Sequence, residues 1–320
     1  YEALTAAVAD TGIRAIFCRF AIAKENDFSA EAAKQVVAEA SAEMARWHGG
    51  ANGNVTMWFG LDVPRRPGDL IYPHFYSAVA EEARRTGAGI VYHFCSEFED
   101  SIYAQNTFGM RPAEWSRDNH ALGPNVLLIG GCWMTPLEMR ILADTGTHLA
   151  HSPVAHMKMA TGILPLPDVQ AAGVNVTLGT DGGLNNNTHD MFAEMKACCL
   201  LQNSSRRSAK ACTALDALEM ATINGAKAIG REHELGSIEP GKLADITLLD
   251  LNRPHTAPTH SLLSNIGFAA NPSNVHTDMI GGRIVLQNNM VLGVDEAAVI
   301  ARVHERAPAI RERLGLSARP

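Results

Sequence analysis

Two side chains in this sequence end apolar runs and are of types that bind divalent metals. His93 closes the run IVYH, and three acidic side chains follow it within seven residues. Asp181 closes the run NVTLGTD and precedes a pair of glycines. An imidazole and a carboxylate together can bind zinc and leave a position open to water, as metal-assisted hydrolysis requires. Taken alone, each also has a structural explanation, as a hydrogen-bonded histidine at a strand end and as an Asx turn or helix N-cap.

Polar residues near these two could supply the other groups that hydrolysis needs. Glu97 lies four residues after His93, where its carboxylate could carry protons. His148 and His151 are three apart in one predicted strand, so their side chains point to opposite faces. His151 is nearer the end of that strand, and we expect it to face the pocket. We expect four other histidines at the surface or in packing contacts: His74, His156, His189 and His276.

Six short apolar runs alternate with amphipathic stretches, a pattern typical of parallel strands joined by helices. The predicted strands are residues 13–20, 54–62, 89–97, 125–132, 147–153 and 175–181. The clearest predicted helices between them are residues 31–47, 76–87, 135–146 and 166–173. Both a doubly wound sheet and a barrel fit this alternation. The sequence has no GxGxxG turn, and His93, His151 and Asp181 stand at carboxyl ends of predicted strands, where a barrel gathers its active site. We therefore predict an α/β fold of the (β/α)8 TIM barrel type.

The last third of the sequence has a different pattern. After a predicted helix at residues 214–229, short apolar runs are separated by the turn pairs Pro240-Gly241, Gly281-Gly282 and Asn288-Asn289. An amphipathic stretch at residues 296–314 follows. We predict three parts: a barrel over residues 1–232, a small β-sandwich domain over 233–295, and a C-terminal helix over 296–320.

Composition limits the classes of function. The chain has 320 residues, of which 46% are hydrophobic, and a formal net charge of -7 without a basic stripe, so we expect no nucleic-acid partner. No apolar run reaches the roughly 18 residues that a membrane span needs, and the first residues lack the features of a secretory signal. We expect a cytoplasmic protein without a membrane partner. The six cysteines form no CxxC pair, and we expect reduced thiols.

Four motifs in the sequence resemble those of the amidohydrolase superfamily. They are AHSPVAHMKMATG, LGTDGGLNNN, LEMATINGAKAIG and LGSIEPGKLADITLLDL. The chain is similar over nearly its whole length to the group that contains cytosine deaminases, adenosylhomocysteine deaminases and triazine chlorohydrolases. The resemblance implies a barrel of the metal-dependent hydrolase type that begins here at its third strand, so the first strands and their HxH pair of metal ligands are missing from this chain. It also implies one divalent metal, zinc or alternatively iron, and a homo-oligomer.

The resemblance further assigns roles to individual residues. His93 matches the metal ligand of the fifth strand, and Asp181 matches the eighth-strand ligand that also accepts a proton from water. Glu97 is expected to shuttle protons, and His151, Asn185 and Asn186 to contact substrate. The implied reaction is hydrolytic deamination of a purine-, pyrimidine-, pterin- or triazine-like ring by metal-activated water. The alternatives are hydrolytic dechlorination at the same site and a catalytically inactive barrel that serves as a binding or assembly subunit.

Two positions depart from the family pattern. The family reads His-x-x-Glu on the fifth strand, whereas this chain has Ser96, with Glu97 one place later. In a continuous strand these two side chains face opposite sides unless a bulge shifts the register. The sixth strand of the family carries a histidine that polarises water or holds the leaving group, and Gly130 stands there. We expect a weakened enzyme unless another group compensates.

Overall fold

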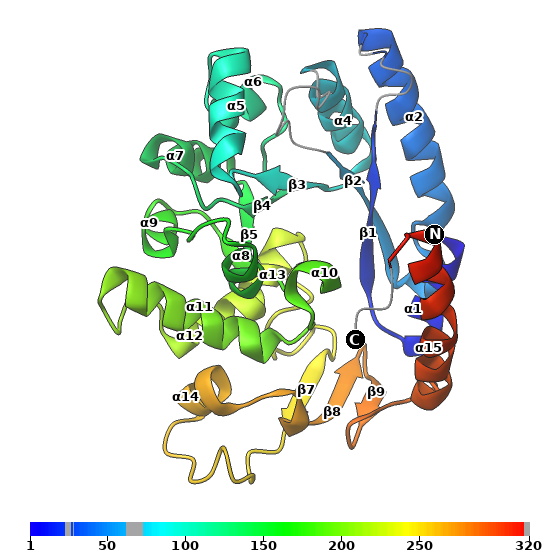
Figure 1. Cartoon of the computed structure of the whole chain (residues 1–320), viewed down its shortest axis with the longest axis vertical. Helices are drawn as coiled ribbons and strands as arrows, with labels where there is room; N and C mark the ends of the chain where they lie inside the picture. The colour runs from blue at the N-terminus through cyan, green and yellow to red at the C-terminus, as the bar shows by residue number, and fades with distance from the viewer. Residues whose placement is uncertain (23–26, 28, 62–72, 317–320) are drawn as a thin grey trace.

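Six parallel strands form one sheet in which each strand pairs with the next along the sequence (Figure 1). This computed structural model describes residues 1–22, 27, 29–61 and 73–316. The strands are β1 (Ala15–Phe20), β2 (Val55–Gly60), β3 (Ile90–Phe94), β4 (Val126–Gly130), β5 (His148–His151) and β6 (Val176–Leu178). All six predicted strands are confirmed, each somewhat shorter than predicted. Residue 62, the predicted end of the second strand, lies outside the described residues.

Helices follow the strands and cover the sheet, as the alternating pattern predicts (Figure 1). They are α1 (Glu2–Thr11), α2 (Ala30–Trp47), α3 (Gly50–Gly53), α4 (Pro73–Thr86), α5 (Phe98–Phe108), α6 (Pro112–Asp118), α7 (Pro136–Thr145), α8 (Pro153–Met159), α9 (Leu166–Ala171), α10 (Gly183–Asn186), α11 (Met191–Arg206), α12 (Ala214–Ala221), α13 (Ile223–Ala228), α14 (Leu262–Ser264) and α15 (Glu296–Arg313). A π-helical turn at Asn265–Ala269 and a 3-10 turn at Pro272–Asn274 follow α14.

Local chemistry explains where these helices begin and end. In α2, the Ser29 hydroxyl accepts a hydrogen bond from the Ala32 amide at 3.1 Å, which satisfies one of the unpaired groups at the helix start. In α7, Thr135 and Glu138 form a capping box, and Gly146 ends the helix with φ of 70°. The predicted helix at residues 214–229 is wrong in one respect. Thr222 leaves helical geometry and divides it into α12 and α13, both of which contact β6.

The core lies between the sheet and its helices. Phe59, Leu128 and Leu149 are fully buried on neighbouring or nearby strands. The buried residues of α2 recur with helical spacing, so one face of the helix packs against β2 and α4: Ala33, Val36, Val37, Ala40 and Met44. Within the described residues β1 and β6 are the two edges of the sheet, an arrangement consistent with the third to eighth strands of a barrel.

A second, antiparallel sheet lies beyond the end of the barrel strands in the sequence. Its strands are β7 (Ile246–Leu249), β8 (Val275–Ile280), β9 (Arg283–Gln287) and β10 (Met290–Val291), in the order β10-β9-β8-β7. Gly281-Gly282 and Asn288-Asn289 connect its hairpins with positive φ at both positions, as predicted for these turn pairs. The described residues supply one sheet of the predicted sandwich. An ion pair between Arg14 and Asp245 ties this sheet to the start of β1.

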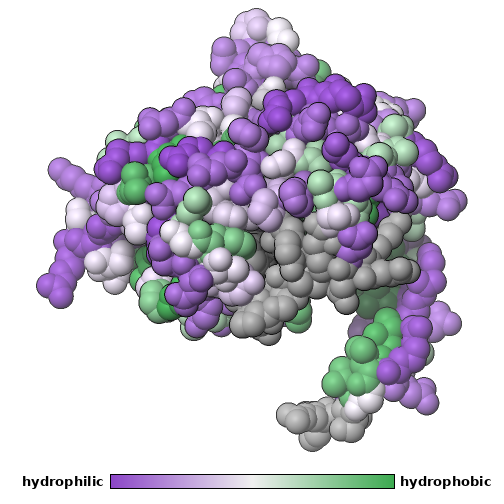
Figure 2. Space-filling model, turned by 90° about the horizontal axis from the view of Figure 1, so that it is seen from above, coloured by the Kyte–Doolittle hydropathy of each residue, from purple (hydrophilic) through white to green (hydrophobic). Residues whose placement is uncertain are grey.

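The surface carries both hydrophilic and apolar groups. Figure 2 shows a face dominated by hydrophilic residues with smaller apolar patches between them. Helix α15 has no buried residue, and several of its apolar side chains are exposed, among them Ile300, Val303 and Ile310. In the described ranges, no helix combines the length and the apolar character that crossing a bilayer requires. The last residues of the predicted C-terminal helix, 317–320, lie outside the described residues.

Candidate active site

The structure places His93 and Asp181 at the same edge of the parallel sheet. His93 is the next-to-last residue of β3 and pairs with Ile129 of β4. Asp181 follows the end of β6 by three residues. Both side chains are partly exposed. Because carboxyl ends of parallel strands meet at one edge, the two residues share the rim on which a barrel forms its active site.

The carboxylate of Asp181 is held by the residues that follow it. Asp181 itself has φ of 60°, a left-handed conformation that Asp tolerates better than most residues. One carboxylate oxygen accepts a hydrogen bond from the Gly182 amide, and the other accepts one from Asn185 Nδ2 at 3.1 Å. These bonds fix the direction of the carboxylate, as supporting bonds around a metal ligand do. Asn185, predicted to bind substrate, thus contacts the predicted metal ligand.

Asn186, also predicted to bind substrate, is buried among structural partners. Its amide nitrogen donates to the Thr180 carbonyl and to Glu194 Oε1, both at 2.6 Å, and its oxygen accepts from Thr188. Glu194 also accepts a hydrogen bond from the Val154 amide at 3.2 Å. Burial raises the pKa of the Glu194 carboxyl. Asn186 and Glu194 therefore join the start of α8 to the segment that carries Asp181, and the substrate role of Asn186 stays a prediction.

The segment after His93 leaves strand geometry earlier than the sequence pattern predicts. Strand β3 ends at Phe94, and Cys95 has φ of 45°, so strand alternation does not extend to Ser96 and Glu97. Asp100 accepts hydrogen bonds from both of their amides, at 2.9 and 3.0 Å. Ser96 is buried, and Glu97 is half-buried at the start of α5. Glu97 thus lies on the same rim as His93, where its predicted role in proton transfer stays open.

Ser96 and Gly130 fit one another sterically. The Ser96 hydroxyl donates to the Ile129 carbonyl at 3.0 Å, which brings it over the end of β4. A Cβ atom at Gly130 would lie 2.0 Å from Ser96 Oγ and 2.9 Å from Ser96 Cβ, and Gly130 has φ of +116°. Both the contact and the backbone conformation exclude an ordinary side chain at position 130. Ser96 therefore occupies the space that a side chain at position 130 would need.

His151 is the last residue of β5 and is buried, and its predicted orientation toward the pocket stays a prediction. Its ring is fully buried, and neither ring nitrogen has a hydrogen-bond partner among the described residues. Burial and, to a smaller extent, the neighbouring His156 together lower the pKa of His151 to about 3. His148 points elsewhere, since its Nδ1 lies 3.0 Å from Asn175 Nδ2. The ring of His151 is neutral and unpaired beside the rim.

Sequence reasoning missed His156 as a site residue. It lies on α8 with its ring buried, and its centroid is 5.5 Å from that of His151. Burial lowers the pKa of His156, the Asp181 carboxylate raises it, and His93 lowers it. The pKa of His156 is thus affected by both predicted metal ligands. The signal that could have found it is its position in the helical turn after a barrel strand, at the rim where active sites gather.

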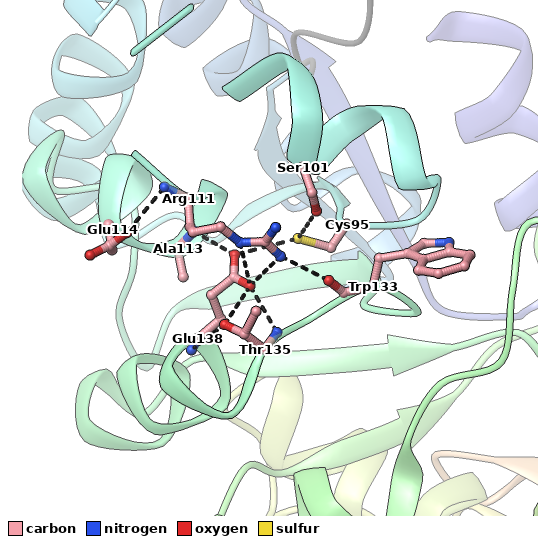
Figure 3. A network of polar contacts seen from close by, with 8 residues as sticks. All are labelled: Cys95, Ser101, Arg111, Ala113, Glu114, Trp133, Thr135 and Glu138. Atoms are coloured by element: carbon pink, nitrogen blue, oxygen red, sulfur yellow. Dashed lines mark hydrogen bonds and ion pairs between the residues drawn. The ribbon is translucent and has the colours of Figure 1, made fainter. Parts of the chain in front are cut away.

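A buried ion pair supports the loops after β3 and β4 (Figure 3). Glu138 is fully buried, and Arg111 donates to it from Nε at 3.1 Å and from a terminal nitrogen at 2.8 Å. Arg111 also donates to the Trp133 carbonyl at 3.0 Å. The Cys95 thiol lies 3.7 Å from the same carboxylate, and Thr135 donates to it twice. The network joins the ends of two strands that carry rim residues, so it fixes their relative position.

The described residues offer part of a metal site. His93 and Asp181 are donors of the kind that zinc and iron accept, and the Asp181 carboxylate is already oriented by hydrogen bonds. Within the described ranges, no group of three or more His, Cys, Asp or Glu side chains could hold a metal ion. A catalytic zinc takes three protein ligands, so this pair fits as two ligands of a larger set.

Comparison with known proteins identifies relatives with deaminase names. A 5'-deoxyadenosine deaminase of Methanosarcina mazei is 32% identical over 268 residues, which are 84% of this chain and 61% of that protein. A 5-methylthioadenosine/S-adenosylhomocysteine deaminase of Moorella thermoacetica is 32% identical over 306 residues, which are 95% of this chain and 69% of that protein. The chain therefore spans about two thirds of the length of these relatives.

Solved structures show the same fold. An adenosine deaminase from Xanthomonas campestris with bound zinc matches with a TM-score of 0.88 and 25% identity, over 97% of this chain and 69% of that one. An atrazine chlorohydrolase from Arthrobacter aurescens matches with a TM-score of 0.85 and 21% identity, over 95% of this chain and 68% of that one. The model of the amidohydrolase family matches residues 1–285. The chain belongs to the amidohydrolase family.

Proposed function

We propose that this chain is the larger part of a metal-dependent hydrolase that removes an amino group from a purine-like ring. The observation that carries the proposal is the placement of His93 and Asp181 at one edge of the parallel sheet. Both residues also act electrostatically on the same histidine, His156. The names of the relatives support hydrolysis of a carbon-nitrogen bond in an adenosine-like compound.

His93 and Asp181 would hold the metal, and we propose zinc because their donor types suit it and a structural relative contains it. Bound zinc lowers the pKa of a water molecule to about 7, so hydroxide is available near neutral pH. The family pattern places two further ligands in a His-x-His pair, and the 320 residues contain none. We therefore propose that ligands from outside these 320 residues complete the site in the natural protein.

The residues of this chain have proposed roles in moving protons and placing the substrate. In the reaction the water oxygen bonds to the ring carbon, the carbon-nitrogen bond breaks, and the nitrogen leaves as ammonia after gaining a proton. Asp181 accepts a proton from water, with its carboxylate directed by Asn185. Glu97, at the start of α5, carries a proton to the leaving nitrogen. His151 lines the substrate side of the rim.

The test combines metal content with product release on the complete natural protein. Elemental analysis is paired with ammonia and chloride assays on adenosine, 5'-deoxyadenosine and a chlorinated triazine. We expect one zinc per chain and ammonia from the nucleosides, with both lost in Asp181→Asn and His93→Ala. His148→Gln is the matched control, because this half-buried histidine contacts Asn175 and should leave both readings unchanged.

Other outcomes separate the alternatives. Chloride release without ammonia would replace the deaminase by a dechlorinating hydrolase at the same site. Protein without bound metal and without turnover would point to an inactive barrel and overturn the proposal.

A further inference from the structure

The ring of His156 lies near residues at or just after the carboxyl ends of four strands. Cys132, just after β4, has its sulfur 3.4 Å from Nδ1 of His156. His151, the last residue of β5, places its ring 5.5 Å away at an interplanar angle of 40°. His93 of β3 and Asp181 after β6 both act on the ring electrostatically. His156 thus contacts or influences groups from four strand ends, although it comes from a helix.

Helix α8 is held at both ends, so the ring has a defined place. At the start of the helix, the Val154 amide donates to the buried Glu194 carboxylate at 3.2 Å. Near its end, Lys158 donates to the Leu184 carbonyl at 2.9 Å and to the Asn187 side chain. Leu184 and Asn187 belong to the turn that follows Asp181. The segment that follows the predicted metal ligand therefore also holds the helix that carries His156.

The partner of Nδ1 determines which face of the ring is available. Burial raises the pKa of the Cys132 thiol to about 12, so this group keeps its proton near neutral pH. The contact between the sulfur and Nδ1 admits either atom as donor. With the protonated thiol as the donor, the ring proton of a neutral imidazole resides on Nε2. Within the described part of the chain, Nε2 of His156 makes no hydrogen bond.

We propose that His156 is a further substrate-contacting residue, which presents its Nε2–H as a hydrogen-bond donor to an acceptor atom of the ring substrate beside His93 and Asp181. Cys132 is the residue that positions it. The identity of the substrate as a purine-like compound rests on the proposed function. A role as metal ligand is the competing assignment, and the zinc content of the His156 variants tests it.

The experiment measures ligand binding, so it does not depend on turnover. Inosine, the product expected from adenosine, is titrated into the complete natural protein by calorimetry. His156→Leu removes the donor, and we expect binding about 3- to 10-fold weaker, the range for one neutral hydrogen bond. His156→Gln keeps an N–H donor of similar reach and should restore part of the loss. Zinc content should stay at the wild-type value in both variants.

Two further variants separate positioning from contact. Cys132→Ser keeps a donor toward Nδ1 and should bind inosine as the wild type does, whereas Cys132→Ala should bind about 2- to 3-fold more weakly. His148→Gln is the control for loss of a histidine on the neighbouring strand, and should bind normally.

The outcomes separate this proposal from the proposed function. Wild-type affinity in His156→Leu, or loss of zinc from His156→Leu and His156→Gln together, would overturn the substrate contact. The protein could instead bind inosine with the expected dependence on His156 but release no ammonia from adenosine. That result would contradict the proposed deaminase activity and support the substrate contact of His156.

Discussion

Acidification should destabilise this protein through His151 alone by about 2 kcal/mol between about pH 8 and about pH 5. The ring is fully buried, and burial lowers its pKa from 6.5 to about 3. Below about pH 6.5 the unfolded chain binds a proton at this residue, whereas the folded chain does not until about pH 3. The contribution of the neutral, buried ring to the unfolding free energy is therefore fully present above the pKa of the unfolded chain. It decreases below that pKa by about 1.4 kcal/mol per pH unit. About one and a half units below 6.5, the loss reaches about 2 kcal/mol.

The assay compares the pH dependence of unfolding in two proteins. Urea unfolding of the wild type and of His151→Phe is followed at about pH 8, 6.5 and 5. Phenylalanine fills the ring volume without binding a proton, and its packing effect is the same at each pH, so it cancels in the comparison. The difference in unfolding free energy between the two proteins should change by about 2 kcal/mol across this range. His74→Phe is the control, because His74 is exposed to solvent.

Two results would refute this reasoning. One is a difference between wild type and His151→Phe that is constant with pH. The other is a histidine resonance of the folded protein, assigned to His151 by its loss in the variant, that titrates near 6.5. Either would mean that the ring reaches water or a partner in the folded state.

Three substitutions test other parts of the structure by chemical denaturation. Gly130→Ala should lower the unfolding free energy by about 3 kcal/mol or more, because the new Cβ meets Ser96 and the backbone has positive φ. The loss should be at least about 1 kcal/mol smaller in a Ser96→Gly background, and strictly additive effects would count against the contact. Arg111→Ala should lower the unfolding free energy by about 2 to 3 kcal/mol, because Glu138 is fully buried and loses its cation. The double variant Arg111→Ala/Glu138→Gln should lose less unfolding free energy than Arg111→Ala alone. An equal or larger loss in the double variant would argue against the ion pair. Gly281→Val should lower stability by about 2 kcal/mol, because the hairpin turn needs positive φ there, and an unchanged midpoint would contradict this turn geometry.

Much of the fold was predictable because its signals are local. The six strands follow apolar runs of the right length, and the helices between them follow from spacing and caps. The hairpin turns at Gly281-Gly282 and Asn288-Asn289 depend on only two residues that tolerate positive φ. His93 and Asp181 were also predictable as rim residues, since a residue at the carboxyl end of a parallel strand is placed by the strand itself.

The tertiary structure decided the contacts between distant residues at the rim. Ser96 closes over Gly130 because β3 ends early at Phe94, a change of backbone direction that an alternating pattern does not reveal. His156 reaches the site because α8 is held against the turn after Asp181. Sequence by itself therefore determined which elements form and which strand ends meet, since periodicity and capping act over a few residues. Which side chains fill the space between those ends depends on packing across the fold, and only the structure shows it.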